Sequence, residues 1–104
     1  MTDPRGSTSL DTRPPEYRLI LFVAGEEPNS RAARENLNQV CTSDLHGRCH
    51  VCIVDVLEDF AAAAKHQVLV TPTLLVTEPE PSVMVIGNLS DHKKVRRALR
   101  LEGS

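Results

Sequence analysis

The most continuous apolar segment of the chain is residues 17–23 (YRLILFV), bounded by Pro15 and Gly25. Apolar side chains at nearly every position are typical of a strand that is buried on both faces of a parallel or mixed sheet. A second β-branched, apolar run covers residues 49–56. We therefore predict two strands, of which the first is a central strand.

A helical pattern separates these two strands. Its apolar residues recur at i, i+4, i+7 and i+8, which gives one stripe along a helix; they are Ala33, Leu37, Val40 and Cys41. Asn29 or Ser30 is expected to cap the start of this helix. Strand, helix and strand of this spacing predict a right-handed βαβ unit.

The second half of the chain contains shorter patterns. Residues 57–67 include four consecutive alanines and predict a second helix. Residues 68–77 read as a strand, and Pro72 is expected at its start because proline has no N–H for a central ladder. Residues 82–86 predict another short strand.

A last helix is predicted over residues 91–101, with Ser90 as its cap and Asp91 at the positive end of its dipole. Its buried face is expected to comprise Val95, Ala98 and Leu99. The order is then βαβαββα, an α/β fold with a mixed four-stranded sheet over residues 17–101. In this arrangement the strand that begins at Cys49 lies at the edge of the sheet.

The two ends of the chain differ from this pattern. Residues 1–16 are rich in proline, glycine and polar side chains, so we expect a disordered tail there, and a short C-terminal tail at residues 102–104. The longest wholly apolar run is far shorter than the roughly 20 residues of a membrane helix. We expect a cytosolic protein that does not enter a membrane.

Charge and aromatic content argue against nucleic acid as a partner. The formal net charge is −2, and the aromatic residues are Tyr17, Phe22 and Phe60. Platforms that stack bases depend on exposed aromatic side chains. No Gly-x-x-x-x-Gly-Lys phosphate loop occurs in the sequence, and we expect no cofactor.

Three cysteines, Cys41, Cys49 and Cys52, are an odd number in a chain read as cytosolic, so we expect reduced thiols. Cys49 and Cys52 form a C-x-x-C pattern, for which a zinc or redox role is the alternative. Residues three apart on a strand point to opposite faces, which opposes a shared metal ion. Structural thiols are therefore the favoured interpretation.

Four segments carry a resemblance to a known family. They are residues 21–25 with 28–30, residues 54–57, residues 68–74 with their Thr-Pro-Thr, and residues 86–90. The element order and the Thr-Pro-Thr resemble the thioredoxin superfamily, which implies a cis bond before Pro72. Taken together, the four segments resemble the KaiB family.

This resemblance implies a regulator that binds the KaiC-type ATPase ring and modulates its phosphorylation and ATPase cycle, in a clock, a timer or a stress response. A KaiA-like protein or a histidine kinase would be a further partner. The family also implies an alternative ground-state fold with a rearranged C-terminal half. The chain would be a homo-oligomer in that state and a monomer when thioredoxin-like.

An enzyme is the competing class. A redox thioredoxin needs a cysteine at the mouth of the first helix, where amides stabilise a thiolate, and residues 25–30 contain none. We therefore expect no catalysis, with a thiol-dependent oxidoreductase as the alternative. A sensor-kinase input domain of the same fold is a third reading.

Candidate functional residues fall into two groups. Partner binding is expected at the edge strand and at the basic last helix, through Cys49, His50, Val51, Cys52, Ile53, Lys93, Lys94 and Arg97. For the basic residues, an ordinary solvated face is the alternative. Structural or switching roles are expected for Gly25, Pro72, Gly87, Asn88 and Asp91, the two glycines supplying positive φ.

Overall fold

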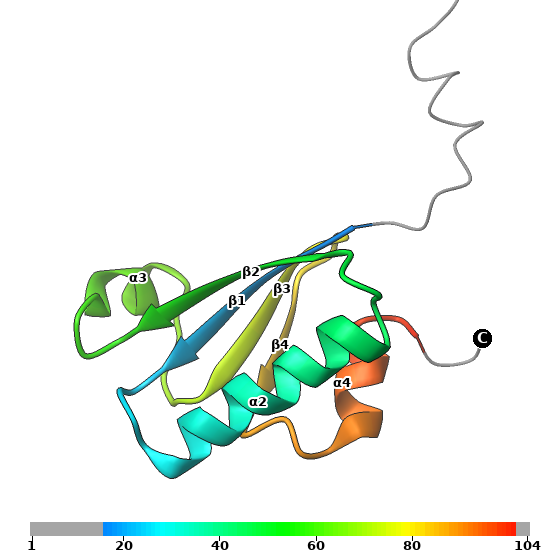
Figure 1. The fold of residues 1–104 in the computed structure, drawn as a ribbon. Coiled ribbons are helices and arrows are strands. Elements are labelled where there is room, and N and C mark those ends of the chain that lie inside the picture. Colours follow the sequence, from blue (N-terminus) through cyan, green and yellow to red (C-terminus); the bar gives the residue numbers. More distant parts are fainter. Residues whose placement is uncertain (1–15, 102–104) are drawn as a thin grey trace, which may run out of the picture.

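Figure 1 shows a computed structural model of the chain, in which residues 16–101 are described. Its sheet has the order β2-β1-β3-β4, with β2 parallel to β1 and the other pairs antiparallel. The strands are β1 (Tyr17–Val23), β2 (Cys49–Asp55), β3 (Thr73–Glu78) and β4 (Val83–Ile86). This confirms the mixed sheet, the central position of β1 and the edge position of β2. The predicted tails lie outside the described residues, except for Glu16.

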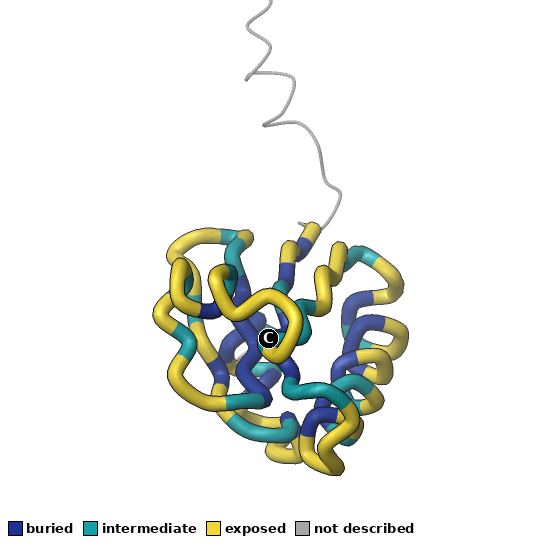
Figure 2. Tube along the Cα trace, turned by 90° about the vertical axis from the view of Figure 1, so that its left-hand side faces the viewer, coloured by how far each residue is buried: buried dark blue, intermediate teal, exposed yellow. Residues whose placement is uncertain are grey.

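Helices cover both faces of this sheet. They are α2 (Pro28–Ser43), α3 (Phe60–Lys65) and α4 (His92–Ala98), and α2 and α4 lie on one face, opposite α3 (Figure 1). The order βαβαββα is as predicted, so the thioredoxin-like arrangement is present here and not the alternative ground-state fold. Buried positions are concentrated in the strands β1 and β3 and on the inner sides of α2 and α4, whereas no residue of the edge strand β2 is buried (Figure 2).

The central strand explains the two cores. Leu19, Leu21 and Val23 on alternate positions of β1 point into the larger core under α2 and α4, whereas Phe22 points into the smaller core with Ala63 of α3. The predicted apolar stripe of α2 and the apolar face of α4 are buried in the larger core. From Leu21 to Val23 the strand is buried on both faces, which is the reason that this part of β1 lacks polar alternation, whereas Arg18 near its start is exposed.

The predicted cap of α2 is wrong. The helix begins at Pro28 and its N-cap residue is Glu27, which makes no side-chain capping bond. The fixed φ of proline suits the first helical position, so the helix starts earlier than Asn29. The hydroxyl of the fully buried Ser30 instead accepts a hydrogen bond of 3.0 Å from the backbone N–H of Ala24.

The two later helices are shorter than predicted. Asp59 caps α3 by accepting from the N–H of Ala62 at 3.1 Å, so residues 57–59 form a turn before the helix. Asp91 caps α4 by accepting from the N–H of Lys94 at 3.2 Å, and the prediction of Ser90 as the cap is wrong. Both carboxylates satisfy an amide that the first helical turn leaves unpaired.

The strand predicted from residue 68 begins later, at Thr73. Residues 68–71 form a loop, and the Thr71–Pro72 peptide bond is cis, as the thioredoxin resemblance implies. The peptide bonds before Pro79 and Pro81 are also cis. Thr73 fixes the loop by donating a hydrogen bond of 2.7 Å from its hydroxyl to the carbonyl of Val70.

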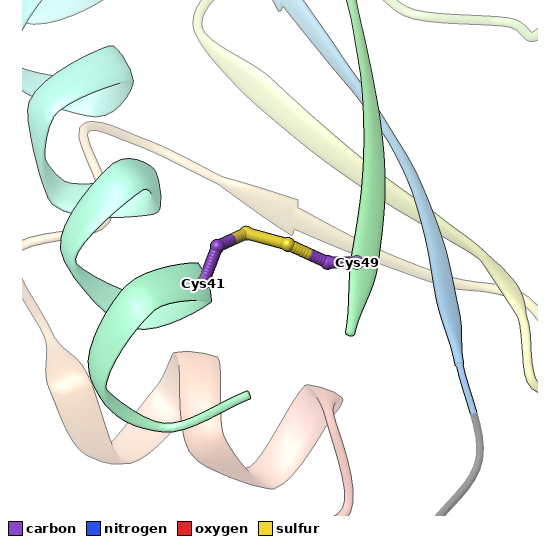
Figure 3. Close-up of a disulfide and its surroundings, with 2 residues drawn as sticks. All are labelled: Cys41 and Cys49. Carbon is purple, nitrogen blue, oxygen red and sulfur yellow. A yellow bond between two sulfur atoms is a disulfide. The ribbon is translucent and has the colours of Figure 1, made fainter. Parts of the chain in front are cut away.

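The expectation of reduced thiols is wrong for two of the three cysteines. Cys41 of α2 and Cys49, the first residue of β2, form a disulfide (Figure 3). The crossing of α2 over the start of β2 brings their Cα atoms to 6.1 Å. Cys52 has a free and exposed thiol. Cys49 packs against the larger core while Cys52 lies beside Ile20 on the other face, which confirms that they point apart.

Candidate interaction surfaces

The turn between β1 and α2 is held by a carboxylate that accepts hydrogen bonds from backbone amides. The carboxylate of Asp55, at the end of β2, accepts hydrogen bonds from the N–H of Gly25 at 3.1 Å and from the N–H of Leu57 at 3.0 Å. Gly25 has φ +55°, which confirms the predicted need for positive φ. Asp55 therefore joins the carboxyl ends of β1 and β2. It also fixes the position of the Leu57 backbone in the turn that follows β2.

Large apolar side chains are exposed at this end of the sheet, where β1 and β2 end and β3 begins. Phe60, Leu69 and Val70 are 74%, 91% and 49% exposed and line one open pocket of about 260 Å³. Leu57, which is 73% exposed, follows Val56, another residue that lines this pocket. We call Leu57, Phe60, Leu69 and Val70 the α3 surface.

Sequence reasoning missed the α3 surface. The sequence predicts a strand at Leu69 and Val70 and a helix at Leu57 and Phe60, and of these four only Phe60 lies in its predicted element. The sequence does carry a signal for turns at these positions. Glu58 and Asp59 stand between Leu57 and Phe60, and Pro72 follows closely after Leu69 and Val70. Leu57, Leu69 and Val70 lie in turns and loops, where no face of a sheet or helix buries them, whereas Phe60 is the first residue of α3 and its side chain is exposed.

The predicted edge-strand residues occupy the two faces of β2 alternately. Val51 and Ile53 are 40% and 49% exposed and face α2 across a groove of about 300 Å³. His50 and Cys52 point to the opposite face, where a ring nitrogen of His50 lies 2.9 Å from a carboxylate oxygen of Glu16. The structure therefore places residues 49–53 on one strand but divides their side chains between two surfaces.

The basic residues of the last helix also divide into two sets. Lys93, Lys94 and Arg97 are exposed and make no ion pair with any described residue. Arg96 pairs with Asp44 at 3.1 Å, and Arg100 donates to the carbonyls of Pro79 and Pro81 at 3.0 Å each. The first set forms an open cationic surface, and the second holds the helix against the rest of the fold.

Among residues 16–101, no group of three or more His, Cys, Asp or Glu side chains lies where it could hold a metal ion. Within the same residues, every helix is too short or too polar to cross a lipid bilayer.

Comparison with known proteins identifies the family. Residues 20–101 match the model of the KaiB domain. The chain belongs to the KaiB family. It is 39% identical over 85 residues to the circadian clock oscillator protein KaiB of Cyanothece sp., covering 82% of this chain and 81% of that protein. The corresponding protein of Picosynechococcus sp. is also 39% identical, with 82% of each chain covered.

Solved structures similar to this KaiB family member share its fold. The N-terminal domain of SasA from Synechococcus elongatus has a TM-score of 0.67 at 17% identity, over 90% of this chain and 92% of that domain. Mitochondrial thioredoxin 3 from Saccharomyces cerevisiae has a TM-score of 0.66 at 15% identity, over 83% and 78%. At these identities the similarities confirm the thioredoxin-like fold and show nothing about function.

The loop from Gly87 to Ser90, which carried part of the KaiB resemblance, is joined to α2. The carbonyl of Asn88 accepts from the side-chain amide of Asn36 at 2.8 Å, and the Asn88 amide lies 3.4 Å from Oδ1 of Asn29. Oδ1 of Asn88 accepts from the N–H of Ser90 at 3.0 Å. Gly87 has φ +117°, as expected, and its N–H donates to the carbonyl of Pro72. Asn88 therefore connects the β4–α4 loop to the first half of the chain.

Proposed function

We propose that this KaiB family member is a non-catalytic regulator that binds a KaiC-type ATPase ring in the cytosol and modulates its phosphorylation and ATPase cycle. The observation that carries this proposal is the α3 surface, where the exposed Phe60, Leu69 and Val70 line one open pocket and the exposed Leu57 lies in the turn before α3. Contiguous exposed apolar patches mark sites of protein interaction. The pathway served is a clock, a timer or a stress response.

The absence of a thiol in the turn before α2 supports a binding role. Residues 25–30 contain no cysteine, and the Ser30 hydroxyl in this segment is buried and engaged with Ala24. The disulfide lies instead at the opposite end of α2, near its last turn. A thiol-dependent oxidoreductase would have to act from that position, away from the amides that activate a thiolate in this fold.

A second partner is proposed at the outer edge of β2. The N–H of Tyr17 donates to the carbonyl of Arg48, and the N–H of Val56 donates to the carbonyl of Val23. The backbone N–H and C=O groups of successive residues alternate in direction along a strand. Those of the even-numbered residues of β2 therefore pair with β1, and those of the odd-numbered residues point away from the sheet. A strand from a KaiA-like protein or a histidine kinase would pair with Cys49, Val51 and Ile53.

This parity gives a sharp test of strand addition. Val51→Pro removes an outward N–H and should abolish partner binding while the sheet persists, because proline is tolerated where the N–H faces solvent. His50→Pro removes an N–H that pairs with β1 and should unfold or destabilise the chain. A folded Val51→Pro variant with unchanged affinity for a KaiA-like partner contradicts the proposal.

We further infer that the thioredoxin-like form is monomeric and exchanges with an oligomeric form whose C-terminal half is rearranged. Pro72, Gly87, Asn88 and Asp91 lie in the half that would change, and Asn88 supplies its hydrogen bonds to α2. The test is molecular mass by light scattering, together with NMR secondary structure of residues 65–100. A single mass at all concentrations, with unchanged strands, would rule out the exchange.

Binding to the ring is tested by sedimentation velocity. The full chain is mixed with a purified KaiC-type ATPase in ATP and in ADP, and the faster-sedimenting ring boundary should carry the chain in at least one nucleotide state. The ATPase rate of the ring should change at the same concentrations. No association in either state would contradict the proposed function.

A further inference from the structure

The disulfide joins two elements that otherwise meet only by packing. Cys41 is buried near the end of α2, and Cys49 is half-buried at the first residue of the edge strand β2 (Figure 3). Their Cα separation of 6.1 Å lies within the range of about 4.4–6.8 Å that a disulfide spans. Cys52 points to the other face of β2, so it does not compete for either sulfur within the chain.

The segment between the two cysteines is folded by contacts other than the disulfide. The N–H of Gly47 donates to the carbonyl of Cys41 at 2.9 Å, and the N–H of Arg48 donates to the carbonyl of Leu45 at 2.9 Å. The side chain of Leu45 is fully buried in the larger core. The two sulfurs therefore stay close when the bond is broken, and the bond can form again without refolding.

The sulfur pair is open to small molecules from one side. Cys41 and Cys49 line the groove of about 300 Å³ that Val51 and Ile53 also line. Arg34, whose guanidinium lies 3.4 Å from a carboxylate oxygen of Glu26, lines the same groove. Of the two sulfurs, that of the half-buried Cys49 is the more accessible to attack.

We propose that Cys41 and Cys49 are a reversible oxidation site that equilibrates with a low-molecular-weight thiol and disulfide of the glutathione type. This proposal goes beyond the binding function. Its consequence is local to β2, because the bond holds the first residue of an edge strand that has a sheet neighbour on one side only. Where strand addition at β2 occurs, the oxidation state sets how ordered the receiving strand is; this last step rests on the proposed function.

The chemistry is two successive exchanges. The Cys49 thiol releases its proton to water, and its thiolate attacks one sulfur of the small disulfide, breaking that S–S bond and expelling one small thiolate. The Cys41 thiolate, also after losing a proton, then attacks the Cys49 sulfur and expels the second. Two electrons pass from the two cysteines to the small disulfide, which takes up two protons as it becomes two thiols.

The test uses the full chain with Cys52→Ser, so that only the thiols of Cys41 and Cys49 can be alkylated and counted. Samples are equilibrated in buffers with graded ratios of reduced to oxidised glutathione, quenched in acid, alkylated and weighed. We expect one transition in which both thiols appear together. Thiols that are both free at every ratio, or both blocked at every ratio, would overturn the proposal.

Amide hydrogen exchange on the same samples measures how the oxidation state affects the order of β2. The amides of His50 and Cys52 pair with β1, so residues 50 and 52 should exchange several-fold faster in the reduced chain, whereas Val95 in α4 should be unchanged. Adding Cys41→Ser should give the fast rates with or without reductant. Equal exchange at residue 50 in the reduced and oxidised chains would overturn the effect on β2. Neither readout contains a KaiC-type ring, so failure here is distinguishable from failure of the proposed function.

Discussion

The hydroxyl of Tyr17, the first residue of β1, donates a buried hydrogen bond of 2.9 Å to the carbonyl of Leu99, the residue that closes α4. The two residues are 82 positions apart in the chain. This bond connects the start of the sheet to the last helix, so it reports directly on whether the C-terminal half is in its thioredoxin-like arrangement.

Tyr17→Phe should lower the free energy of unfolding by about 1–2 kcal/mol, because it keeps the ring in the core but leaves the Leu99 carbonyl without its partner. Urea denaturation measures the loss. Amides of α4 should also exchange faster, whereas those of α2 should not. A variant as stable as the parent chain would show that this bond does not hold α4 in place.

Gly25→Ala should impair binding more than its effect on stability explains. A Cβ atom at this φ of +55° would lie 3.3 Å from Cδ1 of Leu57, a residue of the α3 surface. Gly47→Ala is the matched control, since its φ is +79° and its Cβ would meet no atom within 4 Å.

Both alanine variants should lose about 1–2 kcal/mol of stability from left-handed strain. Only Gly25→Ala should weaken association with a KaiC-type ring, measured by titration calorimetry. Equal affinities for the two variants would argue against a role for Leu57 in binding.

Asp91→Ala should lower the free energy of unfolding by about 1 kcal/mol, since the carboxylate caps the N–H of Lys94. Ser90→Ala is the neighbouring control and should change stability little, because the cap is at position 91. Thermal unfolding of both variants checks the assignment. A larger loss in Ser90→Ala would place the helix start one residue earlier.

The cationic surface of α4 should contribute a salt-dependent part of partner affinity. Lys94→Glu should weaken binding to a KaiC-type ring at low ionic strength, and the difference from the parent chain should shrink at 1 M salt, where the Debye length is about 3 Å. Arg31→Glu, an equal charge change at an exposed position on α2, should have little effect. If both variants bind as tightly as the parent chain at low salt, this surface is an ordinary solvated face.

Local patterns predicted the parts of the fold that depend on local burial. The apolar run of β1 and the stripe of Ala33, Leu37 and Val40 in α2 recorded which faces are buried, and both are confirmed. The choice between Ser90 and Asp91 as a cap could not be made, since either residue type caps a helix well. The start of α2 at Pro28, before the predicted cap, also could not be predicted from the apolar stripe, because the stripe begins only at Ala33.

The surfaces were harder to predict than the core. Leu69 and Val70 have the same side chains as buried strand residues, and only the position of the loop before Pro72 leaves them in solvent. The Cys41–Cys49 bond depends on how α2 crosses β2, a tertiary relationship that spacing along the chain does not report. The alternation of Cys49 and Cys52 could be predicted because it depends on strand geometry alone.

The central claim is that a KaiC-type ring docks on the α3 surface, and the affinities of two charge-introducing variants test it most directly. Leu69 is 91% exposed on that surface, and Ile86 is 55% exposed on β4, so aspartate at either position should be tolerated by the fold. We predict that Leu69→Asp loses at least about tenfold in affinity, or roughly 1.4 kcal/mol, while Ile86→Asp binds like the parent chain. Equal affinities for Leu69→Asp and the parent chain would contradict the account.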